Sequence, residues 1–419
     1  MEHRWFVDRV QYIEKHALRM SISDPARLMG RCSDAQRPVY CRRSRALRKA
    51  GEVGSADLRR GQAMAPIRIG VAGVTHPHAP AHLRNLELMD EIEGVILYDE
   101  DPGALEPLRE RPKVLAVTTS LDELVRRDDV PVLFSLLRHD QAASAILRMV
   151  RAGKHVIAEK PVTRTAAELE VILDAAARRG VQVGAFYQNR WHPAFRQARE
   201  LREASALGRL MSVEARLVTT QVRLRNPRHW LFRRSLAGGG ILSWLGCHYL
   251  DLVRYLTGEE IVAVSAHTAT LSGEPIDVED VAVLTFQLSN GALGTLHSGY
   301  LLAGGKPGYL SPGYDTYVGL RGTQGRLSVQ QGPGPRDTTL LLESLAPGWD
   351  HAAEQRYVIT LPESEGYAGP HGRDFLRRFL AAVLEGGKPV ATGQDALVVL
   401  RIIEAAYTSA AEGRTVRLA

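Results

Sequence analysis

The chain has 419 residues, of which 45% are hydrophobic, and this is enough for two or three domains with well-filled cores. No run approaches the roughly 18 apolar residues of a membrane span, so we expect no membrane partner. Three cysteines, at positions 32, 41 and 247, make no disulfide framework and indicate a cytoplasmic protein. The net charge of +6 comes from residues 1–64, which hold 14 basic and 7 acidic residues. Residues 65–419 hold 39 basic and 40 acidic residues, so we expect no nucleic-acid partner.

The first 64 residues differ from the rest, with five basic residues between positions 42 and 49 and no sustained apolar period. Met64 lies three residues before the first predicted strand. We expect either a wrongly assigned upstream start, with Met64 as the true one, or a genuine basic tail without fixed structure. A targeting peptide is disfavoured, because no apolar core with a small-residue cleavage site follows.

Between residues 65 and 187, short apolar strands alternate with helical segments. Strands are predicted at 67–72, 95–98, 132–136, 155–158 and 182–185, and helices at 81–89, 121–126, 142–152 and 166–179. This alternation predicts an α/β domain with a parallel sheet and crossover helices.

The second half, 188–419, carries more β signal. Strands are predicted at 211–220, 262–270, 281–288, 294–298 and 338–342, and a closing helical segment at 372–411. Turn residues such as those at 289–291 separate neighbouring strands as in hairpins, which predicts a mostly antiparallel sheet. Glycine and proline gather at 302–313, where we expect an irregular loop that covers the site.

The segment 152–162, AGKHVIAEKPV, joins a predicted buried strand to Glu159, Lys160 and Pro161. Pro161 cannot donate to a sheet ladder, so the strand stops there. Ligands of open α/β sheets bind outside the carboxyl ends of the strands. We therefore expect Lys160 on a rigid corner facing a crevice, although Glu159 and Lys160 could also be a solvated charge pair that caps the strand.

The first strand runs into a turn, 73–78, that keeps only part of a dinucleotide fingerprint. Such a fingerprint would place glycine at 73, 75 and 78, and only Gly73 is present beside Thr75 and His78. The turn still follows a strand and precedes a helix, so we expect the pyrophosphate of NAD there, at a helix N-terminus. An imidazole of His76 or His78 would then donate to a phosphate.

Asp99 follows the second strand, 26 residues after Gly73, and we expect it to bind ribose hydroxyls. The acidic residues at 100 and 101 would repel a 2′-phosphate, which favours NAD over NADP. His76, His78 and His82 suggest a metal site, but no Cys, Asp or Glu joins them at ligand spacing. We therefore expect no metal.

A glycine-rich entry at 237–240 precedes a helix on which Trp244, His248 and Asp251 share one face with the tyrosine at 255. A lone histidine on such a stripe is more often a core residue. Here its pairing with Lys160 from the other domain suggests acid–base work, because an alcohol proton must leave as a hydride does. Further candidates for lining the pocket are Arg190, His192, Arg223, Arg225, Arg228 and Arg233.

Together these segments resemble the glucose–fructose oxidoreductase/inositol dehydrogenase (Gfo/Idh/MocA) family. The resemblance covers about 66–419 and rests on 152–162, on YQNRWHPAF at 187–195, on AGGGILSWLGCHYLDLVRYLTG at 237–258 and on GTQGRLSV at 322–329. It implies a Rossmann domain over 65–187, then an α/β substrate and oligomerisation domain over 188–419 with a large open sheet. It also implies an NAD(P)-dependent oxidoreductase of sugars, polyols or inositols, assembled as a homodimer or homotetramer.

The resemblance implies roles for individual residues. Lys160 would bind substrate and nicotinamide, with Glu159 and Pro161 of its motif at the cofactor, and His248 would carry out acid–base work. Arg190, Trp244 and Asp251 are further substrate-binding candidates. Two departures stand out: Trp244 replaces the usual aspartate, and 137–140 replaces the usual threonine-proline turn.

Three other functions stay open. One is an enzyme that retains NAD and uses transient oxidation to eliminate or hydrolyse a glycosidic bond. Another is a nonenzymatic dinucleotide-binding regulator, and the third is a nucleic-acid-associated protein recruited by the basic N-terminal segment.

Overall fold

The computed structural model describes residues 65–304, 313–352 and 354–418, which belong to one compact unit spanning Met64–Ala419. The predictions for residues 1–64, and for most of the loop at 302–313, lie outside the described residues.

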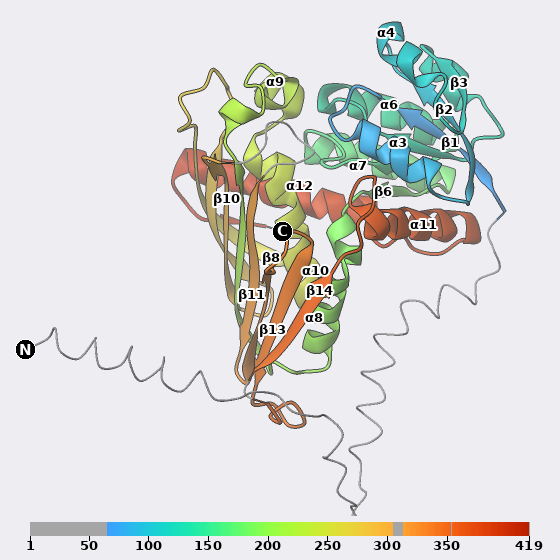
Figure 1. Ribbon diagram of the computed structural model, residues 1–419. Helices are drawn as coiled ribbons and strands as arrows, with labels where there is room; N and C mark the ends of the chain where they lie inside the picture. The colour runs from blue at the N-terminus through green and yellow to red at the C-terminus, as the bar shows by residue number, and fades with distance from the viewer. Residues whose placement is uncertain (1–64, 305–312, 353, 419) are drawn as a thin grey trace, which may run out of the picture. The chain divides into compact units, whose positions relative to one another are not determined.

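The first sheet has six strands in the order β3-β2-β1-β4-β5-β6, and all neighbouring strands run parallel. The strands are β1 Ile67–Ala72, β2 Ile92–Tyr98, β3 Val114–Thr118, β4 Val132–Ser135, β5 His155–Ala158 and β6 Val183–Ala185. The helices between them are α3 Ala79–Glu87, α4 Pro102–Leu105, η3 Glu106–Leu108, α5 Leu121–Val125, α6 His139–Arg151 and α7 Ala166–Arg179 (Figure 1). The strand order reverses between β1 and β4, and dinucleotides bind outside the carboxyl ends of the strands at such a point.

Strand β3, VLAVT, was not predicted although its first four residues are apolar; it is an edge strand, and four of its five residues are only half-buried or exposed. We call the residues that directly follow β1, β4 and β5 the switch-point edge. It is the part of the first sheet on which a dinucleotide site would be built.

The second sheet has nine strands in the order β14-β13-β12-β11-β7-β10-β9-β8-β15. The strands are β7 Leu210–Thr220, β8 Ile261–Ala269, β9 Val281–Leu288, β10 Leu293–Leu302, β11 Tyr314–Gly322, β12 Gly325–Gln331, β13 Asp337–Ser344, β14 Gln355–Thr360 and β15 Val416–Arg417. Only the pair β7–β10 is parallel, so the predicted mostly antiparallel sheet is confirmed. Strands β11, β12, β14 and β15 were missed.

The remaining helices are η4 Gln188–Trp191, α8 Pro193–Glu203, η5 Val222–Leu224, η6 Trp230–Phe232, α9 Arg234–Ala237, η7 Leu242–Gly246, α10 Cys247–Thr257, α11 Gly369–Glu385 and α12 Gly393–Glu412. Helices α8, α10 and α12 contact strands of the second sheet, whereas α11 contacts α3 and η4. The closing segment predicted as helical over 372–411 is therefore two helices. Gly386 ends α11 in the left-handed conformation, and Thr392 starts α12 with a capping box.

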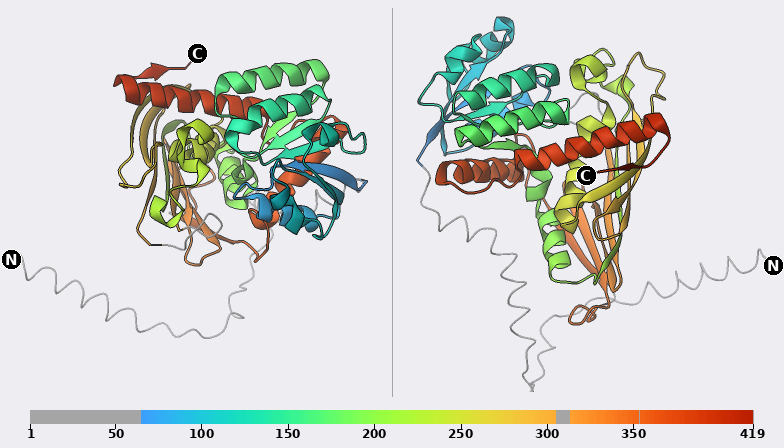
Figure 2. Two further views of the ribbon diagram at one scale, coloured as in Figure 1. Left: turned by 90° about the horizontal axis from the view of Figure 1, so that it is seen from above. Right: turned by 180° about the vertical axis from the view of Figure 1, so that it is seen from behind.

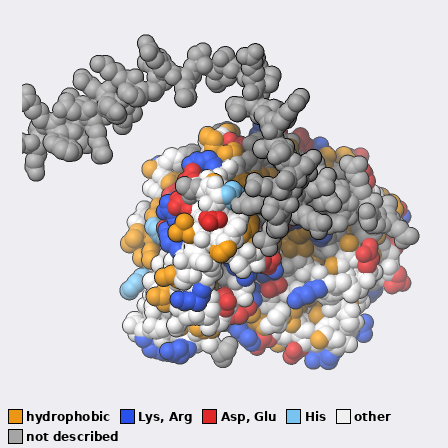
Figure 3. Space-filling view, turned by 90° about the horizontal axis from the view of Figure 1, so that it is seen from below, with side chains coloured by type: hydrophobic (Ala, Val, Ile, Leu, Met, Phe, Trp, Pro, Cys, Tyr) orange, Lys and Arg blue, Asp and Glu red, His pale blue; other side chains and the backbone are white. Residues whose placement is uncertain are grey.

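Helix α12 contacts β8 of the second sheet, and it also contacts helix α7 and strand β6 of the first domain. Figures 1 and 2 show it running past both sheets, and the buried apolar residues of the two sheets form one continuous cluster. Within the described residues, no helix is long and apolar enough to cross a membrane. On the face drawn in Figure 3, basic and acidic side chains are interspersed.

Candidate active site

Lys160 is fully buried, with no exposed surface. Its Nζ donates to the main-chain oxygen of Trp244 at 2.9 Å and lies 3.6 Å from the centroid of the Trp244 ring. A desolvated ammonium over an indole is held by the electrostatics of the ring face. Burial lowers the pKa of Lys160, and the negative charge of Glu159 opposes that shift. The end of β5 therefore meets the second domain at Trp244.

Glu159 joins Lys160 to the turn after β1. Its Oε1 contacts His78 Nδ1 at 3.1 Å and His82 Nε2 at 2.7 Å, and its Oε2 accepts the N–H of Lys160 and lies 3.9 Å from Lys160 Nζ. Burial alone would raise the pKa of Glu159, but the contacts with His78 and His82 and the charge of Lys160 hold it well below its ordinary value. No local pattern could predict this cluster, because Glu159 is 77 residues from His82.

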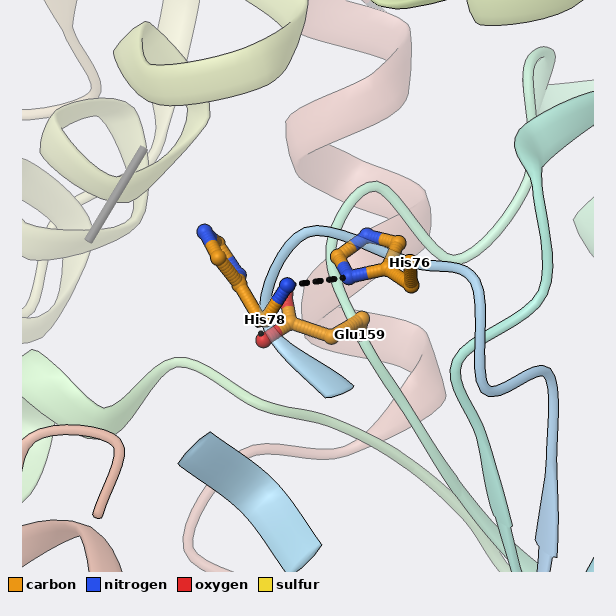
Figure 4. A group of neighbouring side chains, drawn as sticks. All are labelled: His76, His78 and Glu159. Carbon is orange, nitrogen blue, oxygen red and sulfur yellow. Dashed lines mark hydrogen bonds and ion pairs between the residues drawn. The ribbon is translucent and has the colours of Figure 1, made fainter. Parts of the chain in front are cut away.

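His76, His78 and Glu159 also have the composition of a metal site, and Figure 4 shows how they converge. One donor atom of each lies within 4.8 Å of the other two. These donors already contact one another, since His76 Nδ1 accepts the N–H of His78 at 3.1 Å and His78 Nδ1 contacts Glu159. A cation there would also face the buried ammonium of Lys160. The geometry favours a hydrogen-bonded cluster, and the expectation of no metal stays a prediction.

His248 lies at the start of α10, four residues after Trp244. Its ring is 5.8 Å from that of Tyr187, and its Nδ1 has no hydrogen-bond partner among the described residues. Burial, reinforced by the charge of Lys160, lowers the pKa of His248 well below 6.5. A neutral imidazole results, and one of its nitrogens can accept a proton.

The glycine-rich entry to this segment is held by Glu279, which sequence reasoning missed. Glu279 accepts the N–H groups of Gly240 and Leu242 and the hydroxyl of Tyr407, at 2.8–3.1 Å. A Cβ on Gly240 would lie 1.9 Å from the main-chain oxygen of Glu279, so no larger residue fits. The next element, η7 at Leu242–Gly246, is a π-helical turn, a rare form that often marks functional sites.

Arg190 and Asp251 form a buried ion pair. Arg190 Nε and Nη2 donate to the two carboxylate oxygens of Asp251 at 2.9 and 2.6 Å, and both residues are buried. Arg190 also contacts Asp395, which in turn accepts from Arg254 at 3.3 Å. Their predicted contact with substrate stays a prediction, but the geometry favours a role in anchoring α10 and therefore His248.

The other predicted pocket residues have local partners. Arg225 is buried and donates to Thr219 and to the main chain of Thr220. Arg223 and Arg233 donate to main-chain oxygens of the loops beside them. His192 accepts the N–H of Ala194 as the N-cap of α8, and Arg228 is exposed.

The turn after β1 has the form that a dinucleotide site needs at its start. Gly73 has φ +94°, and a Cβ there would lie 2.4 Å from the main-chain oxygen of Leu136, so only glycine fits this approach to β4. The carboxylate of Asp99 accepts the N–H groups of Val74 and Thr75 at 2.8 and 3.3 Å. Asp99 therefore lies beside the glycine turn, where a ribose would be bound, and these residues fit NAD.

The tight glycine turn and a carboxylate at the end of β2, on a parallel sheet, define a Rossmann-type nucleotide-binding domain. Residues 67–187 match the oxidoreductase family with an NAD-binding Rossmann fold, and residues 195–328 match the GFO/IDH/MocA C-terminal domain. The chain belongs to the GFO/IDH/MocA family. The predicted family, fold class and NAD-binding domain are confirmed.

The matches to individual relatives cover nearly the whole length of each relative. A myo-inositol 2-dehydrogenase of Thermotoga maritima is 24% identical over 356 residues, which is 84% of this chain and 98% of the relative. The crystal structure of GenD2 from gentamicin A biosynthesis, in complex with NAD, is 27% identical with a TM-score of 0.71, covering 86% of this chain and 98% of its own. A levoglucosan dehydrogenase complexed with NADH and levoglucosan shares the fold, at 21% identity and a TM-score of 0.72, covering 84% and 99%.

Proposed function

We propose that this oxidoreductase transfers a hydride between NAD and a hydroxyl-bearing or keto carbon of a sugar, polyol or inositol-like substrate. The observation that supports this most is the meeting of Lys160, from the end of β5, with the segment that carries Trp244 and His248. A strand-end lysine and a neutral histidine then serve one reacting centre from two domains.

Gly73, Thr75, His76 and His78 would hold the pyrophosphate half of NAD, and Asp99 would hold a ribose. Glu159, Lys160 and Pro161 would lie at the nicotinamide end. Bound NAD supplies the acceptor or donor of a hydride.

The protein's own groups handle the substrate oxygen. The ammonium of Lys160 binds that oxygen and favours charge on it. His248, neutral because it is buried, takes the hydroxyl proton while the C–H bond gives up its hydride. Oxidation thus removes one hydride and one proton, and reduction returns both. Arg190 and Asp251 keep α10, and with it His248, in place.

We also propose a Rossmann domain over 65–187, a substrate domain over 188–419, a cytoplasmic location and a homodimer or homotetramer. The outer face of the second sheet carries Val283 and Leu293, which are 43% and 62% exposed on neighbouring strands. A second copy would cover them. Light scattering at micromolar concentration should give a dimer or tetramer, and a strict monomer would contradict the proposal.

The function is tested by denaturing the purified protein and identifying any released nucleotide. The native protein is then given added NAD and a panel of sugars, polyols and inositols, and NADH is followed by absorbance. NADH formed with at least one of them supports the proposal. Retained NAD without net NADH, combined with glycoside cleavage, would instead indicate the redox-assisted lyase or hydrolase.

A further inference from the structure

The indole of Trp244 lies against residues from all three segments of the switch-point edge. Its ring centroid is 5.5 Å from that of His76 and 5.1 Å from that of His78, both after β1. It is 5.6 Å from the ring of His139, which starts α6 after β4, and 3.6 Å from Lys160 Nζ, after β5. One side chain of the second domain therefore rests on the part of the Rossmann sheet where a dinucleotide would bind.

The indole is enclosed on its remaining sides as well. Trp230 approaches it edge-on at 6.4 Å, and Trp244 is 2% exposed. Beneath it, Lys160 has no exposed surface at all. Because the ammonium is covered by the ring and bonded to the Trp244 main-chain oxygen, no ligand can contact Lys160 Nζ while the indole stays in this position.

We propose that Trp244 occupies the nicotinamide end of the switch-point edge and must leave it before cofactor and substrate can reach Lys160. This inference rests on the proposed function, because it assumes that NAD binds along this edge. It changes the expected role of Trp244 from a substrate-binding residue to a side chain that competes with the cofactor.

The backbone around Trp244 restricts how the ring can move. Glu279 holds the main chain at Gly240 and Leu242, and α10 begins at Cys247. The π-helical turn between them, Leu242–Gly246, has Trp244 at its centre. Since π-helical turns are rare and frequently lie at functional sites, we place the movement of the Trp244 side chain at this turn.

Competition of this kind has a measurable consequence for affinity. If the competent form is only a fraction of the molecules, the apparent Kd is the intrinsic Kd divided by that fraction. Removing the indole should therefore tighten cofactor binding. A side chain that stacked on the nicotinamide would have the opposite effect, because its loss would remove a contact.

The experiment uses the full chain and NADH as the probe, titrated by its own fluorescence. The variants are Trp244→Ala and Trp244→Phe. Trp349→Ala serves as control, since that residue is half-buried in the loop between β13 and β14. We expect Trp244→Ala to bind NADH about tenfold more tightly, Trp244→Phe to lie between it and the parent, and Trp349→Ala to match the parent.

A stopped-flow measurement keeps the test decisive if Trp244→Ala folds poorly. In the parent, the observed rate of NADH binding should level off at high NADH, because departure of the indole becomes limiting, and Trp244→Phe should raise that plateau. Unchanged or weaker NADH binding in a folded Trp244→Ala, or equal plateaus in parent and Trp244→Phe, would overturn the inference. Failure of parent and variants alike to bind NADH would refute the proposed function itself.

Discussion

Replacing Asp251 by alanine would leave the guanidinium of Arg190 buried without its main partner. Arg190 and Asp251 are 7% and 0% exposed and share two hydrogen bonds, so the pair is screened from water. Removing one partner of a buried ion pair typically costs about 3–5 kcal/mol. Asp395, 3.1 Å from Arg190 Nη2, still neutralises part of the unpaired charge of Arg190. We therefore expect Asp251→Ala to lower the free energy of unfolding by about 3 kcal/mol.

Urea unfolding, followed by circular dichroism, measures this change. Arg190→Met with Asp251→Leu should recover most of the loss, because replacing both partners by apolar residues of similar volume is often neutral. The matched control is the exposed pair Arg401–Glu170, whose side chains are 48% and 45% exposed, and Glu170→Ala should cost under about 1 kcal/mol. If Asp251→Ala left stability unchanged but raised KM, the pair would contact substrate and the reasoning from burial would be refuted.

Three other predictions concern chemistry, cofactor choice and pH. Lys160→Ala and His248→Ala should each lower turnover roughly 100- to 10,000-fold while the protein still folds, and Lys160→Arg should not restore turnover. Near-parental turnover in His248→Ala would show that the proton leaves by another route. NAD should bind more tightly than NADP in a titration, and Asp99→Ala should shrink the difference; equal affinities in the parent would contradict the ribose assignment. Burial would raise the pKa of Asp395, but Arg190 and Thr392 hold it at about 2, below its ordinary 3.8. Its contribution to stability should be present above about pH 4 and lost as the pH falls towards 2, so thermal melts of Asp395→Asn should lack that step.

Features that depend on neighbouring residues could be predicted from the sequence. Strands β1, β4 and β5 were predicted from their apolar runs. Pro161 ends the pattern after β5, and this placed Lys160 at the end of a strand. Strand β3 was missed although Val114–Val117 is an apolar run, and in the fold these four side chains are only half-buried or exposed. The break between α11 and α12 was missed because helical apolar spacing continues on both sides of it.

The contacts that shape the site link residues far apart in the chain. Glu159 meets His82 across 77 residues, and Glu279 holds Gly240 across 39. No spacing rule joins such pairs. The sequence therefore could not show that Glu159 lies beside the histidines of the turn after β1. The same holds for Trp244, which was predicted on one helix face with His248 but lies in the π-helical turn that precedes α10. Its contact with Lys160 depends on how the two domains pack.

The place of α12 affects when the protein can become active during its synthesis. Tyr407, on that helix, completes the hydrogen bonding of Glu279, and α12 also covers α7 and β6 of the first sheet. The last Rossmann strand ends at residue 185. Helix α12, which covers α7 and β6 and supports the glycine-rich entry, is synthesised more than 200 residues later. At about 5–20 residues per second, the ribosome needs tens of seconds for that stretch. During this interval the nascent Rossmann domain exposes an apolar face that chaperones can bind.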